Sequence, residues 1–284
     1  MQIEVEIMSG AGNIFSVIDN FEQKYSPDFF KRYAPLICSQ SYSPKTTEGI
    51  LVIEPSNSVF KDFSLKFFNP DGSFGMMCGN GGRCAVAFAL EKGLVKTNKE
   101  SIKFDVWGQE YSAETLGDEI KITFPPPKLI IQNKLVPVGN YNLLGDFIDV
   151  GSPHFILNFN SIPMSENYDF LSFPITELGR AIRFHNEFSP EGTNVDFFTI
   201  QQDRIFLRTY ERGVEAETGA CGTGAIATAV SVFIKNPNKK SLEIIPTSKE
   251  KIRVVISTNE NQIYALNLIG GYRFLGKYKI FIDD

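Results

Sequence analysis

The sequence has little of what is typical of metal-binding, nucleic-acid-binding and membrane proteins. Its 284 residues include 2 histidines and 4 cysteines, and no two cysteines form a CxxC pair. A zinc knuckle or a thioredoxin-like redox motif is therefore not expected. Lysine and arginine total 28 against 33 acidic residues, which gives a net charge of −5. This balance does not favour nucleic acid or an anionic membrane as a partner.

Long apolar runs and a targeting signal are also missing. The longest helical apolar stretch, Gly224 to Ile234, is too short to span a bilayer. The first residues alternate and include Glu4 and Glu6 instead of a basic start followed by an apolar block. No signal peptide is expected, and we expect a cytoplasmic protein. Structural disulfides are uncommon in that compartment, so catalysis becomes a serious role for at least one cysteine.

A short cysteine motif occurs twice in the chain. Cys78 begins the sequence CGNG, which an apolar, helix-like stretch follows, and Cys221 begins CGTG in the same setting. The pairs Glu48-Gly49 and Glu191-Gly192 are separated by the same number of residues as the two cysteines. Such self-similarity indicates two copies of one α/β unit, each about half of the chain.

The alternating and helical patterns agree with two such units. Helices are expected at 26–39, with a break or bend at Pro35, and at 78–92, 175–186 and 221–234. Strands are expected at 2–8, 15–19, 49–54, 64–69, 102–106, 109–115, 119–123, 147–150, 155–159, 195–200, 204–211, 242–245, 252–258, 262–269 and 272–282. The three prolines Pro125 to Pro127 interrupt regular structure, which predicts a hinge there.

Each motif places a thiol where a helix begins. The first N–H groups of a helix have no partner within it, and they carry the positive end of the helix dipole. Such an end binds an anion, for example a substrate carboxylate, and glycines let the backbone approach it. A thiolate at the same end is stabilised, which lowers the pKa of the cysteine. Cys84 lies further inside its helix, so Cys84 and Cys38 are expected only to pack.

Two such helix ends facing each other would suit the inversion of a carbon centre. The carbon next to a bound carboxylate would then lie between the sulfurs of Cys78 and Cys221. One thiolate would remove a proton from one side, and one thiol would deliver a proton from the other. The reverse reaction exchanges the two roles, so the chemistry suits a nearly symmetric protein.

These residues resemble the diaminopimelate epimerase family. The first cysteine motif is NPDGS from Asn69 followed by MCGNGGRC from Met77, and the second is ERGV from Glu211, then Glu217-Thr218 and ACGTGA from Ala220. Gly10 to Asn13, Pro153-His154 and Gly192 to Val195 resemble further elements of that family, in the same order. The resemblance covers about residues 8 to 225.

The resemblance implies a fold and a division of the chain. The fold class is α/β of the α+β type, with two pseudo-symmetric domains. Each is a mainly antiparallel sheet or barrel around a central helix, with the active site in the cleft between them. One domain would comprise residues 1–127 with a returning strand at about 274–284, and the other residues 128–273. No metal and no other cofactor is implied. The expected partner is a small amino-acid substrate, with a homodimer as a possible assembly and with neither nucleic acid nor membrane.

The resemblance also implies a role for each matching residue. Cys78 and Cys221 correspond to the catalytic acid and base. His154 and Glu211 would flank them, and Arg212 would bind the remote carboxylate through its two-pronged guanidinium. The complete set of implied substrate-binding residues is Asn13, Asn69, Gly79, Asn80, Ser152, His154, Asn194, Glu211, Arg212, Gly222 and Thr223. Asparagines also serve as ordinary turn and cap residues, which is the competing interpretation for those in this set.

The chain departs from the family pattern mainly where it would recognise substrate. Ile14 replaces the usual Asp, Ser152 replaces an Asn, and residues 43–49, SPKTTEG, replace a glycine-rich loop. One extra residue separates Glu211 from Cys221. These changes leave both cysteines in place and concern the identity of the substrate.

Three functions follow from these observations. The first is interconversion of LL- and meso-diaminopimelate, a step toward lysine and peptidoglycan. The second is an epimerase or racemase with the same mechanism and a different or broader amino-acid substrate, as in the related proline racemases. The third is a binding module without catalysis, for which the loss of Cys78 would leave activity unaffected.

Overall fold

A computed structural model describes residues 1–42, 45–96, 99–260 and 262–282. These residues form two compact units, one made of Met1–Thr123 with Ile269–Asp284 and the other of Phe124–Leu268. The expected division into domains at residue 127 stays a prediction. No helix in the described part of the chain has the length and apolarity needed to cross a membrane.

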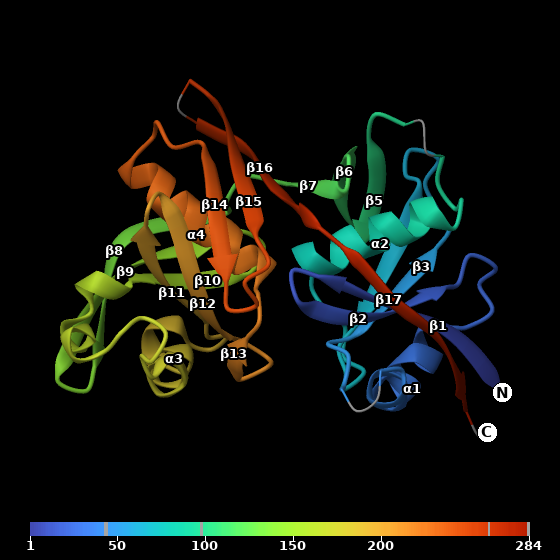
Figure 1. The fold of residues 1–284 in the computed structure, drawn as a ribbon, viewed down its shortest axis with the longest axis horizontal. Coiled ribbons are helices and arrows are strands. Elements are labelled where there is room, and N and C mark those ends of the chain that lie inside the picture. The colour runs from blue at the N-terminus through green and yellow to red at the C-terminus, as the bar shows by residue number, and fades with distance from the viewer. Residues whose placement is uncertain (43–44, 97–98, 261, 283–284) are drawn as a thin grey trace. The chain divides into compact units, whose positions relative to one another are not determined.

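The first unit is a sheet with two helices (Figure 1). Helix α2 packs on β1, β2 and β3, and every residue from Gly79 to Ala89 in it is buried. A helix buried on all sides needs an apolar composition all round, which this one has apart from Asn80 and Arg83. The elements are β1 (Gln2–Gly10), β2 (Asn13–Asp19), α1 (Pro27–Gln40), β3 (Ile50–Glu54), β4 (Phe63–Phe68), α2 (Gly79–Glu91), β5 (Ile102–Val106), β6 (Gln109–Leu116), β7 (Glu119–Phe124) and β17 (Arg273–Phe281).

The second unit repeats this plan. Helix α4 packs on β9, β10, β11, β14 and β15, and its residues from Gly222 to Phe233 are buried. The elements are β8 (Leu129–Val138), β9 (Tyr141–Asp149), β10 (Pro153–Asn158), the short 3₁₀ helices η1 (Phe159–Ser161) and η2 (Pro163–Asn167), α3 (Ile175–Arg183), η3 (Asn186–Phe188), β11 (Asn194–Gln201), β12 (Arg204–Glu211), β13 (Ala216–Thr218), α4 (Gly222–Lys235), β14 (Ser241–Pro246), β15 (Ile252–Asn259) and β16 (Gln262–Gly271).

The two units have the same sequence of strand pairings. In the first unit β17–β1 and β1–β2 are antiparallel, β2–β3 parallel, β3–β4 antiparallel, β4–β5 parallel and β5–β6 antiparallel. In the second, β8–β9 and β9–β10 are antiparallel, followed by β10–β11 parallel, β11–β12 antiparallel, β12–β14 parallel and β14–β15 antiparallel. The parallel pairs are joined through α1 and α2 in one unit and through α3 and α4 in the other. The predicted fold class is thereby confirmed: mainly antiparallel sheets, each with a central helix, in two related copies.

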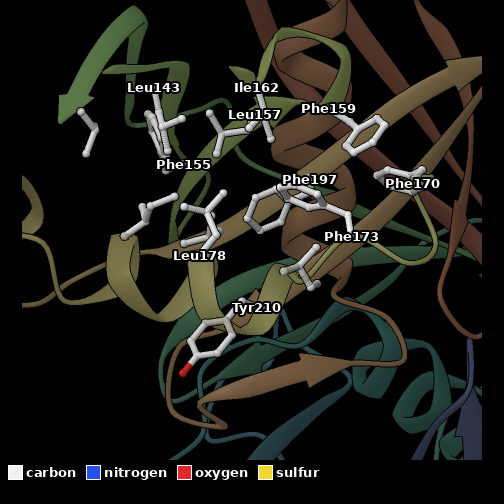
Figure 2. Close-up of a cluster of buried hydrophobic side chains, with 14 of the residues drawn as sticks. Leu143, Phe155, Leu157, Phe159, Ile162, Phe170, Phe173, Leu178, Phe197 and Tyr210 are labelled. Carbon is white, nitrogen blue, oxygen red and sulfur yellow. The ribbon is translucent and has the colours of Figure 1, made fainter. Parts of the chain in front are cut away.

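One hydrophobic core cluster of the second unit lies between its sheet and α3. Figure 2 shows Phe155 and Phe197 from β10 and β11 among side chains from α3 and the segment before it. The rings of Phe159 and Phe173 meet edge to face, with their centroids 5.3 Å apart. Aromatic side chains bury large apolar areas, so this cluster holds the strands in place behind the polar residues at their ends.

Most predicted elements are present, and the corrections concern helices α1 and α3 and strands β8 and β13. Strand β13 (Ala216–Thr218) was not among the predicted strands. Helix α1 continues through Pro35, so the first alternative, a break there, is wrong, while the second, a bend, stays a prediction. Helix α3 ends at Arg183, and a separate 3₁₀ turn follows at Asn186–Phe188. Strand β8 was not predicted, because half of its length is an exposed run without strict alternation.

Candidate functional site

Both cysteine motifs, CGNG from Cys78 and CGTG from Cys221, place their cysteine directly before a buried helix. Cys78 is the N-cap residue of α2, and Cys221 is the N-cap residue of α4. Both have extended backbone, with φ −100° and ψ 117° at Cys78 and φ −120° and ψ 113° at Cys221. The first full helical bonds follow at once, from Gly82 N to the Cys78 carbonyl at 2.7 Å and from Ala225 N to the Cys221 carbonyl at 2.9 Å.

The two cysteines differ in burial. Cys78 is partly exposed, whereas Cys221 has 6% of its surface exposed. Burial raises the pKa of the Cys221 thiol well above its ordinary value, and the negative charges of Glu211 and Asp196 raise it further. The lowered pKa expected for a thiol at a helix end is therefore wrong for Cys221, because burial outweighs the helix dipole. Cys221 favours the protonated form, which suits an acid more than a base. Cys38 and Cys84 are also thiols and are wholly buried, as expected of cysteines that pack.

In the first unit, hydrogen bonds connect Asn13, Asn80 and two residues that the sequence did not indicate. Nδ2 of Asn80 donates to Oδ1 of Asn13, and Nδ2 of Asn13 donates to the carboxylate of Glu48. Arg83 donates to Oδ1 of Asn80 over 2.9 Å and to the carbonyl oxygens of Gly79 and Gly271 over 3.4 Å. Asn80 and Arg83 have no exposed surface. The first turn of α2 is thus held from its buried side.

Asn69 lies in a turn of its own in the first unit. Its backbone N–H donates to the Ser73 carbonyl over 2.9 Å, and its side-chain Nδ2 donates to Oγ of Ser73 over 2.9 Å. These contacts fit the turn role that was weighed against substrate binding. Ile14 packs against the apolar core of α1, and Thr47 bonds to Ser16, so both departures from the family pattern fill the interior. Positions 43 and 44 of the altered loop lie outside the described residues.

In the second unit, His154 joins the ends of two strands to the first turn of α4. Nδ1 of His154 is 2.6 Å from Oδ2 of Asp196, and Nε2 is 3.0 Å from Oγ1 of Thr223. Oγ1 of Thr223 is 3.5 Å from Sγ of Cys221. Strands β10 and β11 are parallel and pair His154 with Asn194, which brings these polar residues to one edge of the sheet.

Glu211 lies on the neighbouring strand, β12. Its carboxylate accepts the Thr218 hydroxyl over 2.8 Å. Desolvation raises the pKa of the Glu211 carboxyl, while the Thr218 hydrogen bond and the nearby His154 lower it. Contact with Cys221 also lowers the pKa of Glu211, so the carboxyl and the thiol are neighbours.

Asn194 connects the remaining candidates of the second unit. Its Nδ2 donates to Oγ of Ser152 over 2.8 Å and to the Pro153 carbonyl over 2.9 Å, and its Oδ1 accepts the Arg212 backbone N–H over 2.8 Å. The serine that replaces the family's asparagine is therefore held in position by a second asparagine. The guanidinium of Arg212 donates to the Glu191 carbonyl over 3.4 Å.

The structure brings together most of the predicted residues within each unit and adds others. Asn13, Gly79 and Asn80 gather at Cys78, and His154, Glu211, Gly222 and Thr223 gather around Cys221. Ser152 and Arg212 are joined to Asn194, which is the strand partner of His154. The residues that sequence reasoning missed are Glu48, Arg83, Asp196, Thr209 and Thr218. The signal for Arg83 and Asp196 was a single charge inside an otherwise apolar helix or strand. Within the described ranges, no group of three or more His, Cys, Asp or Glu side chains is placed to hold a metal ion.

Comparison with known proteins identifies the family. The sequence profile described as "Diaminopimelate epimerase" matches residues 5–125 and 147–272. Diaminopimelate epimerase of Aquifex aeolicus is 36% identical over 267 residues, which are 90% of this chain and 91% of that protein. The enzyme of Chlorobaculum tepidum is 36% identical over 262 residues, with 92% and 91% covered.

Solved structures with the same fold are more distant in sequence. A hydroxyproline epimerase from Agrobacterium vitis superposes with a TM-score of 0.75 at 13% identity, covering 100% of this chain and 93% of its own. A phenazine biosynthesis protein of Bacillus anthracis superposes with a TM-score of 0.70 at 10% identity, covering 99% and 100%. These likenesses extend over both units and concern the fold alone. The long matches to curated relatives, together with the two cysteine motifs, show that the chain belongs to the diaminopimelate epimerase family.

Proposed function

We propose that this protein interconverts LL- and meso-diaminopimelate by proton transfer at one α-carbon, with Cys78 and Cys221 as the two acid–base groups. The observation that carries the proposal is that one arrangement of a cysteine and a helix occurs in both units. In each unit a thiol is the N-cap residue of a buried, glycine-rich helix. Membership of the family supplies the substrate class.

The helix ends supply a binding site for the carboxylate beside the reacting carbon. N–H groups in the first turns of α2 and α4 have no acceptor within their helices, and they attract an anion. Gly79 and Asn80 in one unit, and Gly222 and Thr223 in the other, provide these groups. Hydrogen bonds to the carboxylate favour the carbanion-like transition state because negative charge grows there during proton removal.

The proton transfer follows from the ionisation of the thiols. A thiolate takes the α-proton, the C–H electron pair is delocalised into the carboxylate, and the other thiol gives its proton to the opposite face. One thiol and one thiolate are regenerated with their roles exchanged. Burial raises the pKa of Cys221 and favours its thiol form, so the proposal takes Cys221 as the proton donor in the direction in which Cys78 removes the α-proton. Side chains alone carry these steps, and the proposal uses no metal or prosthetic group.

The distal half of the substrate has a second ammonium and a second carboxylate. We assign the distal carboxylate to the Arg212 guanidinium, since a planar fork of donors matches a carboxylate. Asn194 fixes the backbone at Arg212, and Ser152 lies beside it. Asn13, Asn69, His154 and Glu211 complete the proposed set of substrate-binding residues.

A second candidate is an epimerase of the same mechanism with another or a broader amino-acid substrate. The observation that favours it is Ser152, whose short hydroxyl is held by Asn194 where the family has an asparagine. A shorter side chain leaves more room and one donor fewer at this position. This changes the recognition of the distal group and leaves the two thiols unaffected.

Proton–deuterium exchange tests both candidates. The purified protein is incubated in heavy water with LL-diaminopimelate, meso-diaminopimelate and a panel of single amino acids, and deuterium at the α-carbon is measured together with inversion. Incorporation with inversion of diaminopimelate alone supports the first candidate. Incorporation only into another amino acid supports the second, and incorporation into none of them contradicts both.

The proposed setting is the cytoplasm, where glutathione and thioredoxin keep thiols such as Cys78 and Cys221 reduced. There the reaction would supply lysine and peptidoglycan synthesis. The proposed assembly is a homodimer, and sedimentation at several concentrations tests it, with a constant monomer mass as the contradicting result.

A further inference from the structure

A chain of buried polar side chains leads from Asp196 to the Cys221 thiol. Asp196 and His154 have no exposed surface, and their contact is 2.6 Å between Oδ2 and Nδ1. The chain continues from Nε2 of His154 to Oγ1 of Thr223 over 3.0 Å and from Oγ1 to Sγ of Cys221 over 3.5 Å. A carboxylate buried this deeply in a strand is costly unless each of its oxygens has a partner.

The fold provides those partners. Asp196 pairs with Thr209 across the antiparallel strands β11 and β12, and the Thr209 hydroxyl donates to Oδ1 of Asp196 over 2.6 Å. The carboxylate also lies close to the first turn of α4. A Cβ on Gly224 would be 2.6 Å from Oδ1 of Asp196, so only glycine lets the helix approach this carboxylate. The positive end of the helix dipole stabilises a negative charge at this place.

The hydrogen bonds have a defined direction at Asp196. An ionised carboxylate only accepts, and its Oδ1 already accepts from Thr209. Nδ1 of His154 must therefore carry a proton and donate it to Oδ2. Nε2 is the ring nitrogen that faces Thr223.

The rest of the chain has two arrangements in which every hydrogen bond is satisfied. In one, His154 is neutral, Nε2 accepts the Thr223 hydroxyl, and Oγ1 of Thr223 accepts the Cys221 S–H. In the other, Nε2 is protonated and donates to Oγ1, whose own proton points at a Cys221 thiolate. The two arrangements differ by one proton moved from Sγ to Nε2 and by a reversed hydroxyl.

We propose that His154 takes and returns the proton of Cys221 through the Thr223 hydroxyl. Asp196 is the positioning residue that orients His154 for this transfer. In the forward transfer the S–H bond breaks as an O–H bond forms on Thr223, and the former O–H proton forms the N–H bond at Nε2. No electron is gained or lost. The Asp196 carboxylate stabilises the resulting imidazolium. The proposal rests on the proposed function, in which Cys221 acts as acid in one direction and as base in the other.

The charges around Cys221 make such a relay useful. Glu211 approaches from β12 and Asp196 from β11, and both raise the pKa of the Cys221 thiol in addition to burial. His154, from β10, is the titratable nitrogen base joined to Cys221 through Thr223. A thiolate formed at Cys221 is disfavoured by those carboxylates unless a positive charge forms beside it. The imidazolium supplies that charge.

Kinetics on diaminopimelate test the relay through three variants. Asp196→Asn and Thr223→Val are expected to lower kcat about tenfold to hundredfold, a fraction of what general acid–base groups contribute, with KM changed by less than about threefold. Thr223→Ser, which restores the hydroxyl, is expected to recover most of the kcat lost in Thr223→Val. The alkaline decline of kcat/KM is expected at lower pH in Asp196→Asn, because removing this negative charge lowers the pKa of Cys221.

Asp146 provides the matched control. It is a carboxylate of the same unit with 1% exposed surface, and it bonds to Ser231 and Lys235, about two and three turns of α4 beyond Thr223. Asp146→Asn is expected to lower the melting temperature and to leave kcat and its pH profile unchanged. Equal effects of Asp146→Asn and Asp196→Asn on kcat, or full activity of Thr223→Val, would overturn the relay.

Nitrogen-15 NMR of the histidine rings tests the arrangement without any activity. The chain has 2 histidines. His185 accepts the Glu187 backbone N–H at Nδ1 over 3.2 Å, so it carries its proton on Nε2 and serves as the internal reference. His154 is expected to show a protonated Nδ1 bonded to Asp196, and this signal is expected to move in Asp196→Asn. A His154 ring protonated on Nε2 alone would overturn the proposal even in a fully active enzyme. This NMR result does not depend on the substrate, so it tests the relay even if diaminopimelate is not turned over.

Discussion

Arg83 donates to Oδ1 of Asn80 over 2.9 Å, and both side chains are completely buried in the first turn of α2. A guanidinium can only donate, so it fixes which end of the Asn80 amide faces which neighbour. Nδ2 of Asn80 is directed to Asn13, and Nδ2 of Asn13 is directed in turn to Glu48. One buried cation therefore orients two amides beside Cys78.

Replacing Arg83 is expected to weaken both the fold and substrate binding. Arg83→Met leaves Oδ1 of Asn80 without its guanidinium donor, and an unsatisfied buried polar group costs about 1–3 kcal/mol. We expect the free energy of unfolding to fall by at least about 2 kcal/mol and KM for diaminopimelate to rise, as measured by urea denaturation and steady-state kinetics.

The control for this prediction is Arg204→Met. Arg204 forms an exposed ion pair with Glu243 over 3.0 Å, and exposed pairs contribute little. Its loss is expected to change the unfolding free energy by less than about 0.5 kcal/mol. If Arg83→Met has an equally small effect on stability and KM, the orienting role of the guanidinium is wrong.

Loss of either proposed catalytic thiol is expected to abolish epimerisation. Cys78→Ala and Cys221→Ala each remove one of two acid–base groups, and one group cannot deliver a proton to the face opposite the one it deprotonates. We expect turnover of LL-diaminopimelate to fall by about 10²-fold or more. Cys38→Ala is the matched control, because Cys38 lies on α1, is buried in the apolar core of the first unit and is expected to affect stability alone. Activity of the Cys78→Ala protein equal to that of Cys38→Ala would contradict the two-thiol mechanism.

The sequence indicates the two cysteines because their signal is local. A thiol, two glycines and an apolar periodic run predict a helix that begins at that residue, and both helices begin within one residue of the expected position. The strands around them alternate or are uniformly apolar, which again can be read within a few residues.

The missed residues depend on contacts between distant segments. The guanidinium of Arg83 bonds to the Gly271 carbonyl, which is 188 residues away, and Asp196 meets His154 across 42 residues. The sequence around Arg83 and around Asp196 shows a charged residue in an apolar helix or strand, but it does not indicate which distant residue that charge contacts. Strand β8 was missed for a different reason: it forms a local hairpin with β9, but its exposed run lacks strict alternation and its register shifts between Ile131 and Lys134.

The stability of the protein is expected to depend on Cys38 at alkaline pH. Burial raises the pKa of the Cys38 thiol from 9.0 to about 11. The unfolded chain loses this proton near pH 9.0 while the folded protein keeps it, so the stabilisation present below pH 9.0 is lost as the pH rises toward about 11. Two pKa units correspond to about 3 kcal/mol.

Urea denaturation of wild type and Cys38→Ala across this range measures the effect. Lysine and tyrosine titrations are common to both proteins, so the difference between their unfolding free energies isolates Cys38. We expect the advantage of the wild type to shrink by up to about 3 kcal/mol as the pH rises. A difference that is constant with pH would show that the thiol is not shielded from solvent.

The pH dependence of catalysis is expected to respond to Thr218. The Thr218 hydroxyl donates to the Glu211 carboxylate over 2.8 Å and lowers a pKa that desolvation raises. Thr218→Val removes this donor, which disfavours the charged carboxylate and raises the pKa of Glu211 further. If the carboxylate is the form required beside Cys221, the acidic decline of kcat/KM moves to higher pH by about one to two units, since a hydrogen bond to a charged group contributes about 1.5–3 kcal/mol.

Two further variants separate this effect from a general loss of structure. Thr218→Ser keeps the hydroxyl and is expected to move the acidic decline back toward that of the wild type. Thr199→Val alters a buried threonine on β11, three pairs along the ladder from the Asp196–Thr209 pair, and is expected to leave the profile unmoved. An acidic decline that stays in place in Thr218→Val would mean that the ionisation of Glu211 does not control the reaction. The protonation of Cys221 would then be set by burial and by the Asp196–His154–Thr223 chain alone.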